Sequence, residues 1–416
     1  MERLSAKQRT RRSIWQRALA VFLAFLLVLA LVLSYAVRVN IRRQAYTPLS
    51  NNLDAAAINY LVDSTEYLRE GFVSRLRRML PSYYPGRLSA EEYYQRASEA
   101  IAKEKYGDAL ANINACLSMV SSEDASYEDL KMKQGCLFAL LGRHEQALEA
   151  FETVLQDNPQ NAQTNLLCAQ VYAELGDIYG AVGQLERYLE LTPDDLEMQL
   201  ALVQLYYLQG SFERTDQAAT EYLARAEQYA ENAYFLRGAS RVQLGSLDLA
   251  IQDFQVALDA GYEGVLCLEQ MAICAFLLGD NQSTLDYGNR ALELAKTSNI
   301  EIMGEVYGYM GFAALILKEN ESAVQHLTSA IGLATQPAQL YYYRGVSYMA
   351  MDDLISAAED FTTAIDNGET TVLAYYNRGA CYLALGKSDL AKLDMQKVVE
   401  LDADAELTKI AKDILK

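Results

Sequence analysis

The chain has 416 residues, of which 51% are hydrophobic, and its formal net charge is −19. Residues 1–43 contain nine Lys and Arg and one acidic residue, so the remainder has 27 basic and 54 acidic residues. A remainder near −27 repels phosphate backbones, which argues against nucleic acid as a partner. The six prolines fall between helical patterns, where a missing N–H does little harm, so the composition favours an all-α fold.

A run of apolar residues, 18–37, follows a basic tail, residues 1–17. The run is long enough to span a bilayer as a transmembrane helix, and Trp15 and Tyr35 flank it where aromatic rings favour the interface. Six basic residues precede the run and three follow it, so the charge rule places the N-terminus in the cytoplasm. The sequence therefore predicts a single-pass cell-membrane protein with a signal-anchor, whose larger part is extracytoplasmic.

Two features leave topology and cleavage of this helix open. Ser34, Tyr35 and Ala36 resemble a signal-peptidase site. Six cysteines without CxxC spacing are also unusual in an oxidising exterior. Their helical positions predict buried, inert thiols rather than disulfides or metal ligands.

Residues 38–89 form a predicted juxtamembrane helical stalk, with a helical pattern over 54–80 that ends at the proline-rich residues 81–86. Arginines stand beside apolar residues near the end of this helix. It is therefore compatible with an anionic lipid surface, and a solvated helix is the plainer alternative.

From residue 90 onward, two small residues twelve positions apart recur nine times. Two antiparallel helices pack closely only where neither presents a bulky side chain, so each pair marks a predicted helix crossing. Val203, Thr215 and Thr284 are larger, and we expect less regular packing in the fourth and sixth repeats. The first set is Ala97, Gly135, Ala169, Val203, Gly238, Ala272, Gly311, Gly345 and Gly379, and the second is Ala109, Ala147, Ala181, Thr215, Ala250, Thr284, Ala323, Ala357 and Ala391.

A turn stands five residues before each member of the second set. Glycine takes this place in six repeats, because it can adopt the positive φ that closes a helix. Lys318 and Asp352 take it in two others. The glycines are Gly142, Gly176, Gly210, Gly245, Gly279 and Gly386.

The chain resembles the tetratricopeptide repeat (TPR) family most clearly in the run Tyr375-Tyr376-Asn377-Arg378-Gly379-Ala380-Cys381-Tyr382-Leu383-Ala384-Leu385-Gly386, followed by Ala391. The resemblance covers about residues 90–402. It implies a right-handed superhelical solenoid of about nine TPR-like helical hairpins, here behind an N-terminal transmembrane helix. This indicates a membrane-anchored, bacterial-type TPR protein in which residues 403–416 form a C-terminal capping helix.

Three arginines precede three aspartates by sixteen residues each, in separate repeats. Sixteen residues cross one helical hairpin, so we expect an Arg–carboxylate ion pair in each. The pairs are Arg237 with Asp253, Arg344 with Asp360, and Arg378 with Asp394.

The TPR resemblance implies that a partner lies along the concave wall, which the first helix of each repeat lines. The matching positions here are mostly apolar or aromatic, which suits an extended or helical peptide with apolar anchors. The basic and Asn residues with which some family members clamp a peptide carboxylate are absent. The predicted wall comprises Met132, Leu166, Leu200, Tyr207, Phe235, Ile273, Phe276, Phe312, Tyr342, Met349, Tyr376 and Leu383.

The sequence shows no recognisable catalytic or cofactor-binding motif. His144 and His326, the two histidines, lack catalytic or metal spacing and are predicted to be surface residues, and no nucleotide-binding loop appears. We therefore expect no enzyme activity, cofactor, metal or small-molecule substrate. The leading hypothesis is a membrane-anchored scaffold or adaptor that binds a peptide or protein in the concave TPR groove. The alternatives are an accessory subunit of an envelope enzyme or secretion complex, and a passive spacer without a specific ligand.

Overall fold

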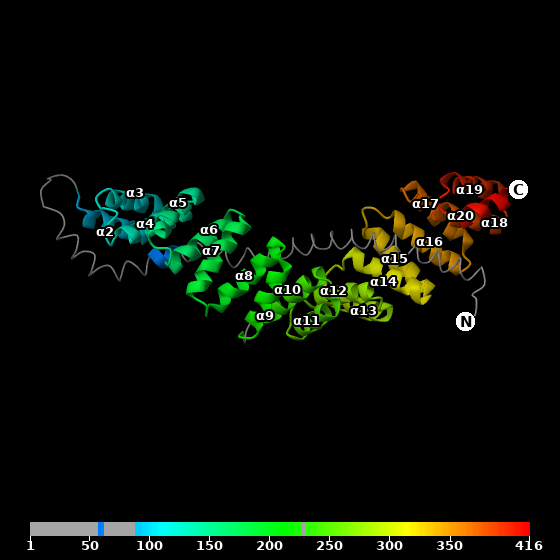
Figure 1. Cartoon of the computed structure of the whole chain (residues 1–416), viewed down its shortest axis with the longest axis horizontal. Helices are drawn as coiled ribbons and strands as arrows, with labels where there is room; N and C mark the ends of the chain where they lie inside the picture. The colour runs from blue at the N-terminus through cyan, green and yellow to red at the C-terminus, as the bar shows by residue number, and fades with distance from the viewer. Residues whose placement is uncertain (1–56, 62–87, 227–229) are drawn as a thin grey trace. The chain divides into compact units, whose positions relative to one another are not determined.

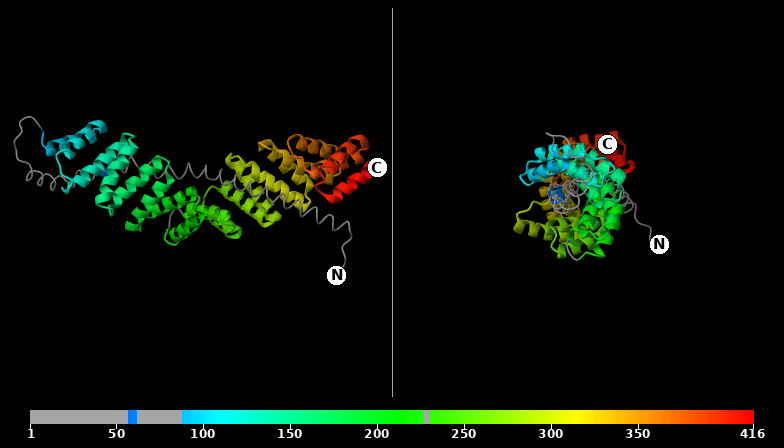
Figure 2. Two further views of the ribbon diagram at one scale, coloured as in Figure 1. Left: turned by 45° about the horizontal axis from the view of Figure 1, so that its top comes forward. Right: turned by 90° about the vertical axis from the view of Figure 1, so that its left-hand side faces the viewer.

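The structure, a computed structural model, describes residues 57–61, 88–226 and 230–416, and the regular structure in these ranges is entirely helical (Figure 1). The chain divides into two compact units, which we describe separately. The N-terminal unit contains the described residues 57–61 and 88–226, and the C-terminal unit contains residues 230–416. In both units, consecutive helices stack side by side (Figure 2).

The N-terminal unit contains a helical turn formed by residues 57–61, followed by four helical hairpins. The helices of these hairpins are α2 (Ala90–Ile101) with α3 (Tyr106–Leu117), α4 (Tyr127–Leu140) with α5 (His144–Asp157), α6 (Ala162–Glu174) with α7 (Ile178–Leu191), and α8 (Leu196–Gln209) with α9 (Phe212–Leu223).

The C-terminal unit contains five hairpins and a final helix, α20 (Ala405–Leu415). Leu407 and Ala411 of α20 are buried against Met395 and Val398, so this helix covers apolar surface of the last hairpin. The hairpins are α10 (Ala230–Gln243) with α11 (Leu247–Asp259), α12 (Gly264–Leu278) with α13 (Asn281–Ser298), α14 (Gly304–Leu317) with α15 (Asn320–Leu333), α16 (Ala338–Ala350) with α17 (Leu354–Asp366), and α18 (Val372–Ala384) with α19 (Ser388–Leu401).

Polar caps and left-handed residues set several helix ends. Ser89 and Glu92 form a reciprocal capping box at the start of α2, which satisfies two N–H groups that have no partner within the helix. Asp177 begins α7 by accepting a hydrogen bond from the N–H of Gly180 at 3.0 Å. Gly210 ends α8 at φ 80°, as the turn glycines predict.

The small residues lie at the helix crossings that the sequence predicts. Every member of the second set is fully buried, and every member of the first set is buried as well. At Gly135, an added Cβ would lie 2.3 Å from the ring of Phe151, and at Gly345 it would lie 3.0 Å from Phe361. These contacts confirm that a small residue allows each close approach.

The expectation of looser packing is confirmed in one of the two repeats. The hairpin of α8 and α9, with Val203 and Thr215 at its crossing, is the least closely packed of the hairpins in the described ranges. The hairpin of α12 and α13 packs as closely as its neighbours, so the prediction for Thr284 was wrong. The hydroxyl of Thr284 donates to the carbonyl oxygen of Asp280 at 2.9 Å, so this buried hydroxyl has a hydrogen-bond partner within its own helix.

The predicted membrane helix lies outside the described residues, as do the basic tail 1–17 and most of the stalk. Among helices within 57–61, 88–226 and 230–416, none combines the length and the apolar character needed to cross a bilayer.

Candidate protein-binding surface

Four residues of the predicted wall lie on α16 and α18 in the C-terminal unit. Tyr342, Met349 and Tyr376 are half-buried, and Leu383 is 37% exposed. The ring of Tyr342 lies 5.6 Å from that of Phe361 on α17. Together these residues present apolar and aromatic surface that retains contact with solvent. We call Tyr342, Met349, Tyr376 and Leu383 the C-terminal wall.

A hydrogen bond joins the two helices of this wall. Asn377 on α18 donates from Nδ2 to the hydroxyl oxygen of Tyr342 at 3.1 Å. Burial raises the pKa of Tyr342 above its ordinary value, and it does the same for Tyr376. Both phenols are therefore neutral at physiological pH. Each side chain has an apolar ring with one polar end.

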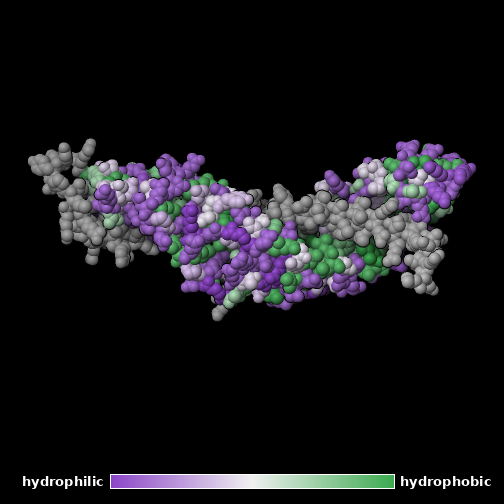
Figure 3. Space-filling view, viewed as in Figure 1, coloured by the Kyte–Doolittle hydropathy of each residue, from purple (hydrophilic) through white to green (hydrophobic). Residues whose placement is uncertain are grey.

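Aromatic residues on α12, α14 and α16 form a connected series. Phe276 and Phe312 are buried. Their ring centroids lie 5.0 Å from Tyr309 and 4.9 Å from Tyr343, respectively. Figure 3 shows hydrophobic residues gathered over α12 to α14. Phe276 and Phe312 thus contribute to packing between successive repeats, in addition to the binding role that the sequence predicts.

Three further residues of the predicted wall are buried in interhelical packing. Met132 accepts a hydrogen bond from the Thr164 hydroxyl through its sulfur. The centroid of the Tyr207 ring lies 5.7 Å from Phe212. Phe235 stacks on Tyr262 at 4.6 Å.

Ile273 is also buried, whereas Leu166 and Leu200 are half-buried on α6 and α8. The predicted wall therefore mixes core residues with accessible ones. A binding role for its members stays a prediction, and it applies most directly to the accessible side chains of α16 and α18.

Sequence reasoning missed a polar pair on α12. Glu269 and Gln270 are both buried, and Glu269 Oε1 accepts a hydrogen bond from the N–H of Met303 at 2.7 Å. Met303 is the N-cap of α14, so this carboxyl group links two repeats. Burial raises the pKa of Glu269 to about 7. The sequence did carry a signal for this pair, because Glu269 and Gln270 are the charged and amide side chains of an otherwise apolar α12.

A second polar group was missed in the N-terminal unit. Lys133 on α4 is fully buried, and its Nζ lies 2.7 Å from Oδ1 of Asp129. The hydroxyl of Tyr60 donates to the same oxygen at 2.9 Å. Burial lowers the pKa of Lys133, while the Asp129 charge opposes that change. Tyr60 lies far away in sequence, so local patterning gave no sign of this contact.

The cysteines are buried and free, as predicted. Burial raises the thiol pKa to about 12 for Cys136 and to about 11 for Cys381. Within the described part of the chain, no three His, Cys, Asp or Glu residues are grouped to hold a metal ion. His144 and His326 are half-buried, so their prediction as surface residues was only partly correct. Burial also lowers the pKa of His326.

Two-helix repeats with small residues at each crossing define a tandem helical-repeat protein. The chain carries tetratricopeptide repeats: models of that family, described as tetratricopeptide repeat, match residues 139–205 and 372–404. Such repeats generally mediate protein–protein interactions and are typically not enzymes.

A TPR repeat-containing protein of Methanocaldococcus jannaschii is 26% identical over 191 residues, which is 44% of this chain. The match spans only 32% of that relative's length. Among solved structures, the C-terminal part of a TPR repeat-containing protein from Cytophaga hutchinsonii has 17% identity and a TM-score of 0.48, covering 60% of this chain and 98% of that one. A tetratricopeptide repeat protein from Parabacteroides merdae has 17% identity and a TM-score of 0.38, covering 62% and 98%.

Proposed function

We propose that the protein is a membrane-anchored scaffold whose C-terminal wall binds a peptide or protein through apolar anchors. The observation that carries this proposal is the accessible apolar and aromatic surface of α16 and α18. Aromatic side chains contribute much contact energy at low entropic cost, and burial of their rings removes apolar area from water. The net charge of the chain, −19, favours partners that are not themselves strongly acidic.

Leu383 and Leu393 provide a matched test within one hairpin. Both are exposed leucines, Leu383 on α18 at 37% and Leu393 on α19 at 59%. A photo-crosslinking amino acid at position 383 should capture a partner in cells, and the same probe at 393 should not. Mass spectrometry of the products identifies the captured chain.

Substitution then tests whether the captured chain binds at this surface. Leu383→Arg should reduce its capture at least tenfold, because an arginine places a charge where an apolar anchor binds, while Leu393→Arg should leave capture unchanged. A partner that is an enzyme active only in the complex would favour the accessory-subunit alternative. Equal crosslinking from both positions would contradict the wall assignment and favour the passive spacer.

We also propose that residues 18–37 anchor the chain and that the repeats are extracytoplasmic, from the hydropathy and charge pattern alone. Ser388 is exposed at the start of α19, so Ser388→Cys adds one accessible thiol beside six buried ones. A maleimide that cannot cross membranes should label this thiol equally in intact and lysed cells. Labelling only after lysis would show that the repeats face the cytoplasm. Recovery of the chain in the soluble fraction would contradict the proposed anchor.

A further inference from the structure

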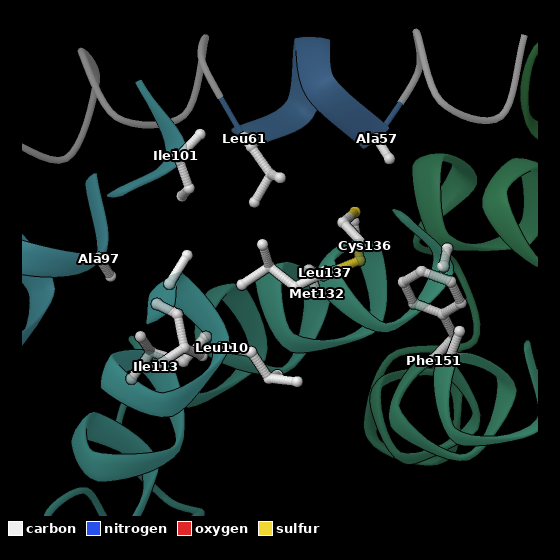
Figure 4. Packing of buried hydrophobic residues seen from close by; sticks show 14 of the residues in the cluster. Ala57, Leu61, Ala97, Ile101, Leu110, Ile113, Met132, Cys136, Leu137 and Phe151 are labelled. Atoms are coloured by element: carbon white, nitrogen blue, oxygen red, sulfur yellow. The ribbon is translucent and has the colours of Figure 1, made fainter. Parts of the chain in front are cut away.

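One face of α4 in the N-terminal unit is covered by residues from outside the repeats. Asp129, Met132, Lys133 and Cys136 stand at helical spacings that place them on one side of α4. The turn 57–61 lies against them, with Ala57 and Leu61 fully buried in the same apolar cluster. Figure 4 shows Leu61 and Ala57 pointing from the turn towards α4. We call these four residues of α4 the docking face.

Polar contacts fix the position of the turn on this face. Tyr60 donates its hydroxyl to Oδ1 of Asp129 at 2.9 Å, across 69 residues of sequence. The Lys133 ammonium, which bonds the same oxygen, lies 5.2 Å from the centroid of the Tyr60 ring. Apolar packing alone would permit the turn to slide along α4. A shared carboxylate oxygen and a cation over the ring favour one register.

The turn also completes the surroundings of a buried charge. A fully buried lysine is rare unless it is paired. Asp129 supplies the opposite charge, and the ring of Tyr94 on α2 lies 5.8 Å from the ammonium on another side. Tyr60 adds a second aromatic face, which comes from outside the repeats. The docking face is therefore built to receive an aliphatic side chain and a phenol on one helical turn.

We propose that the docking face of α4 is an internal peptide-binding site and that its ligand is the chain's own turn 57–61. Residues 62–89 connect the turn to α2, and their extended reach of about 90 Å allows it to dock within one chain. Such a connection gives an effective concentration of about 1 mM, so a separate chain of similar chemistry competes poorly. The site ties the residues before the repeats to the first two hairpins and closes this face to partners.

Cys136 reports on the docked turn in the full-length chain. Its thiol is fully buried on the docking face, so reaction with N-ethylmaleimide requires that face to open. Leu61→Asp should accelerate its labelling at least tenfold, measured for each cysteine by mass spectrometry. Asn59→Asp is the matched control, because Asn59 lies on the exposed side of the same turn and should leave the rate within twofold. An unchanged rate in Leu61→Asp would overturn the proposal.

Cys116 and Cys168 distinguish undocking from unfolding, because they are buried elsewhere in the same unit. If their labelling also accelerates in Leu61→Asp, Tyr60→Phe decides. This variant keeps the ring and removes the hydrogen bond to Asp129, so labelling of Cys136 alone should rise about threefold. An unchanged rate at Cys136 in that variant would overturn the proposal.

A peptide of residues 50–66 tests the face as a binding site. Added to the Leu61→Asp chain at about 1 mM, it should restore protection of Cys136, whereas the same peptide carrying Leu61→Asp should not. Failure to restore protection would overturn the assignment. Protection in the unaltered chain should also persist over a hundredfold dilution. Its loss on dilution would show that a second copy supplies the turn, which overturns docking within one chain. None of these outcomes depends on binding at the C-terminal wall.

Discussion

Arg344 on α16 donates two parallel hydrogen bonds to Asp360 on α17, from Nε to Oδ2 and from Nη2 to Oδ1, both at 2.8 Å. Its remaining nitrogen, Nη1, donates to the hydroxyl of Thr328 on α15 at 3.0 Å. One guanidinium thus joins the two helices of its own hairpin and also contacts the preceding hairpin. Arg378 repeats this arrangement with Asp394 and Thr362.

Removal of the carboxylate should destabilise the C-terminal unit. Asp360 is buried, so Asp360→Ala leaves the guanidinium of Arg344 without its charged partner. Breaking a fully buried pair costs about 3–5 kcal/mol. Because Arg344 keeps some solvent contact, we expect a loss of about 2–3 kcal/mol. Hydrogen exchange of the amides in α16 and α17 measures this as faster opening.

Glu359→Ala is the control for this substitution. Glu359 is the exposed neighbour on α17, and its replacement should change the stability by less than about 0.5 kcal/mol. Equal effects of the two substitutions would mean that the ion pair contributes nothing to the stability of the hairpin.

The ion pairs were predictable because their spacing repeats. The third pair, Arg237 with Asp253, also forms, at 3.0 Å from Nε and 2.7 Å from Nη2. Sixteen residues lead from one helix to the facing position on the next, so periodicity in sequence becomes proximity in space. The small residues of the crossings were predictable for the same reason, since each repeat imposes the same close approach.

Exposure along the predicted wall was not predictable to the same degree. Phe235 and Tyr376 occupy equivalent positions of their repeats, yet Phe235 is buried and Tyr376 is half-buried. The difference depends on neighbouring side chains that do not recur in every repeat, such as Tyr262, which stacks on Phe235 from the connection between α11 and α12. The contact between Tyr60 and Asp129 could not be predicted from the sequence for another reason, because no repeat period relates the two residues.

Two helical glycines of the N-terminal unit should respond to alanine in opposite directions. Gly135 on α4 has no space for a Cβ, which would lie 2.3 Å from the buried ring of Phe151. Gly135→Ala should therefore cost about 1–3 kcal/mol of stability through overpacking. Gly183, inside α7, has no neighbour within 4 Å of its added Cβ.

Gly183→Ala should instead stabilise the unit by about 0.5–1 kcal/mol, because alanine loses less backbone entropy in a helix. Urea unfolding, followed by circular dichroism, compares the two variants with the unaltered chain. If both substitutions stabilise the protein, the crossing at position 135 has room for a Cβ, which would contradict the close approach assigned to Gly135.

Replacing Lys318 with glycine should increase the stability of the C-terminal unit. It ends α14 in the left-handed region at φ 65°, where the turn glycines of other repeats stand. A side chain in this conformation brings Cβ too close to the backbone, so Lys318→Gly should stabilise the C-terminal unit by about 0.5–1 kcal/mol. The check is a higher melting temperature than that of Lys318→Ala, which retains the Cβ. A lower melting temperature for the glycine variant would contradict the assigned strain.

Glu269 should make the C-terminal unit less stable as pH rises through neutrality. Its pKa is raised from 4.5 to about 7 in the folded chain, chiefly by burial, so folding favours the protonated carboxyl group. Its contribution to stability is therefore fully present below pH 4.5 and is lost as pH rises through about 7. The two pKa values correspond to a change of about 3 kcal/mol.

Glu269→Gln isolates this effect, because the amide oxygen can still accept the hydrogen bond from the N–H of Met303. At pH 8 the variant should melt several degrees above the unaltered chain, since no charge is buried. Below pH 4.5 the two proteins should melt together, because Glu269 is then neutral in both the folded and unfolded states. Glu263→Gln is the control, since Glu263 is exposed at the start of α12 and this substitution removes no buried charge. A pH-independent effect of Glu269→Gln would mean that the carboxylate stays charged in the folded chain.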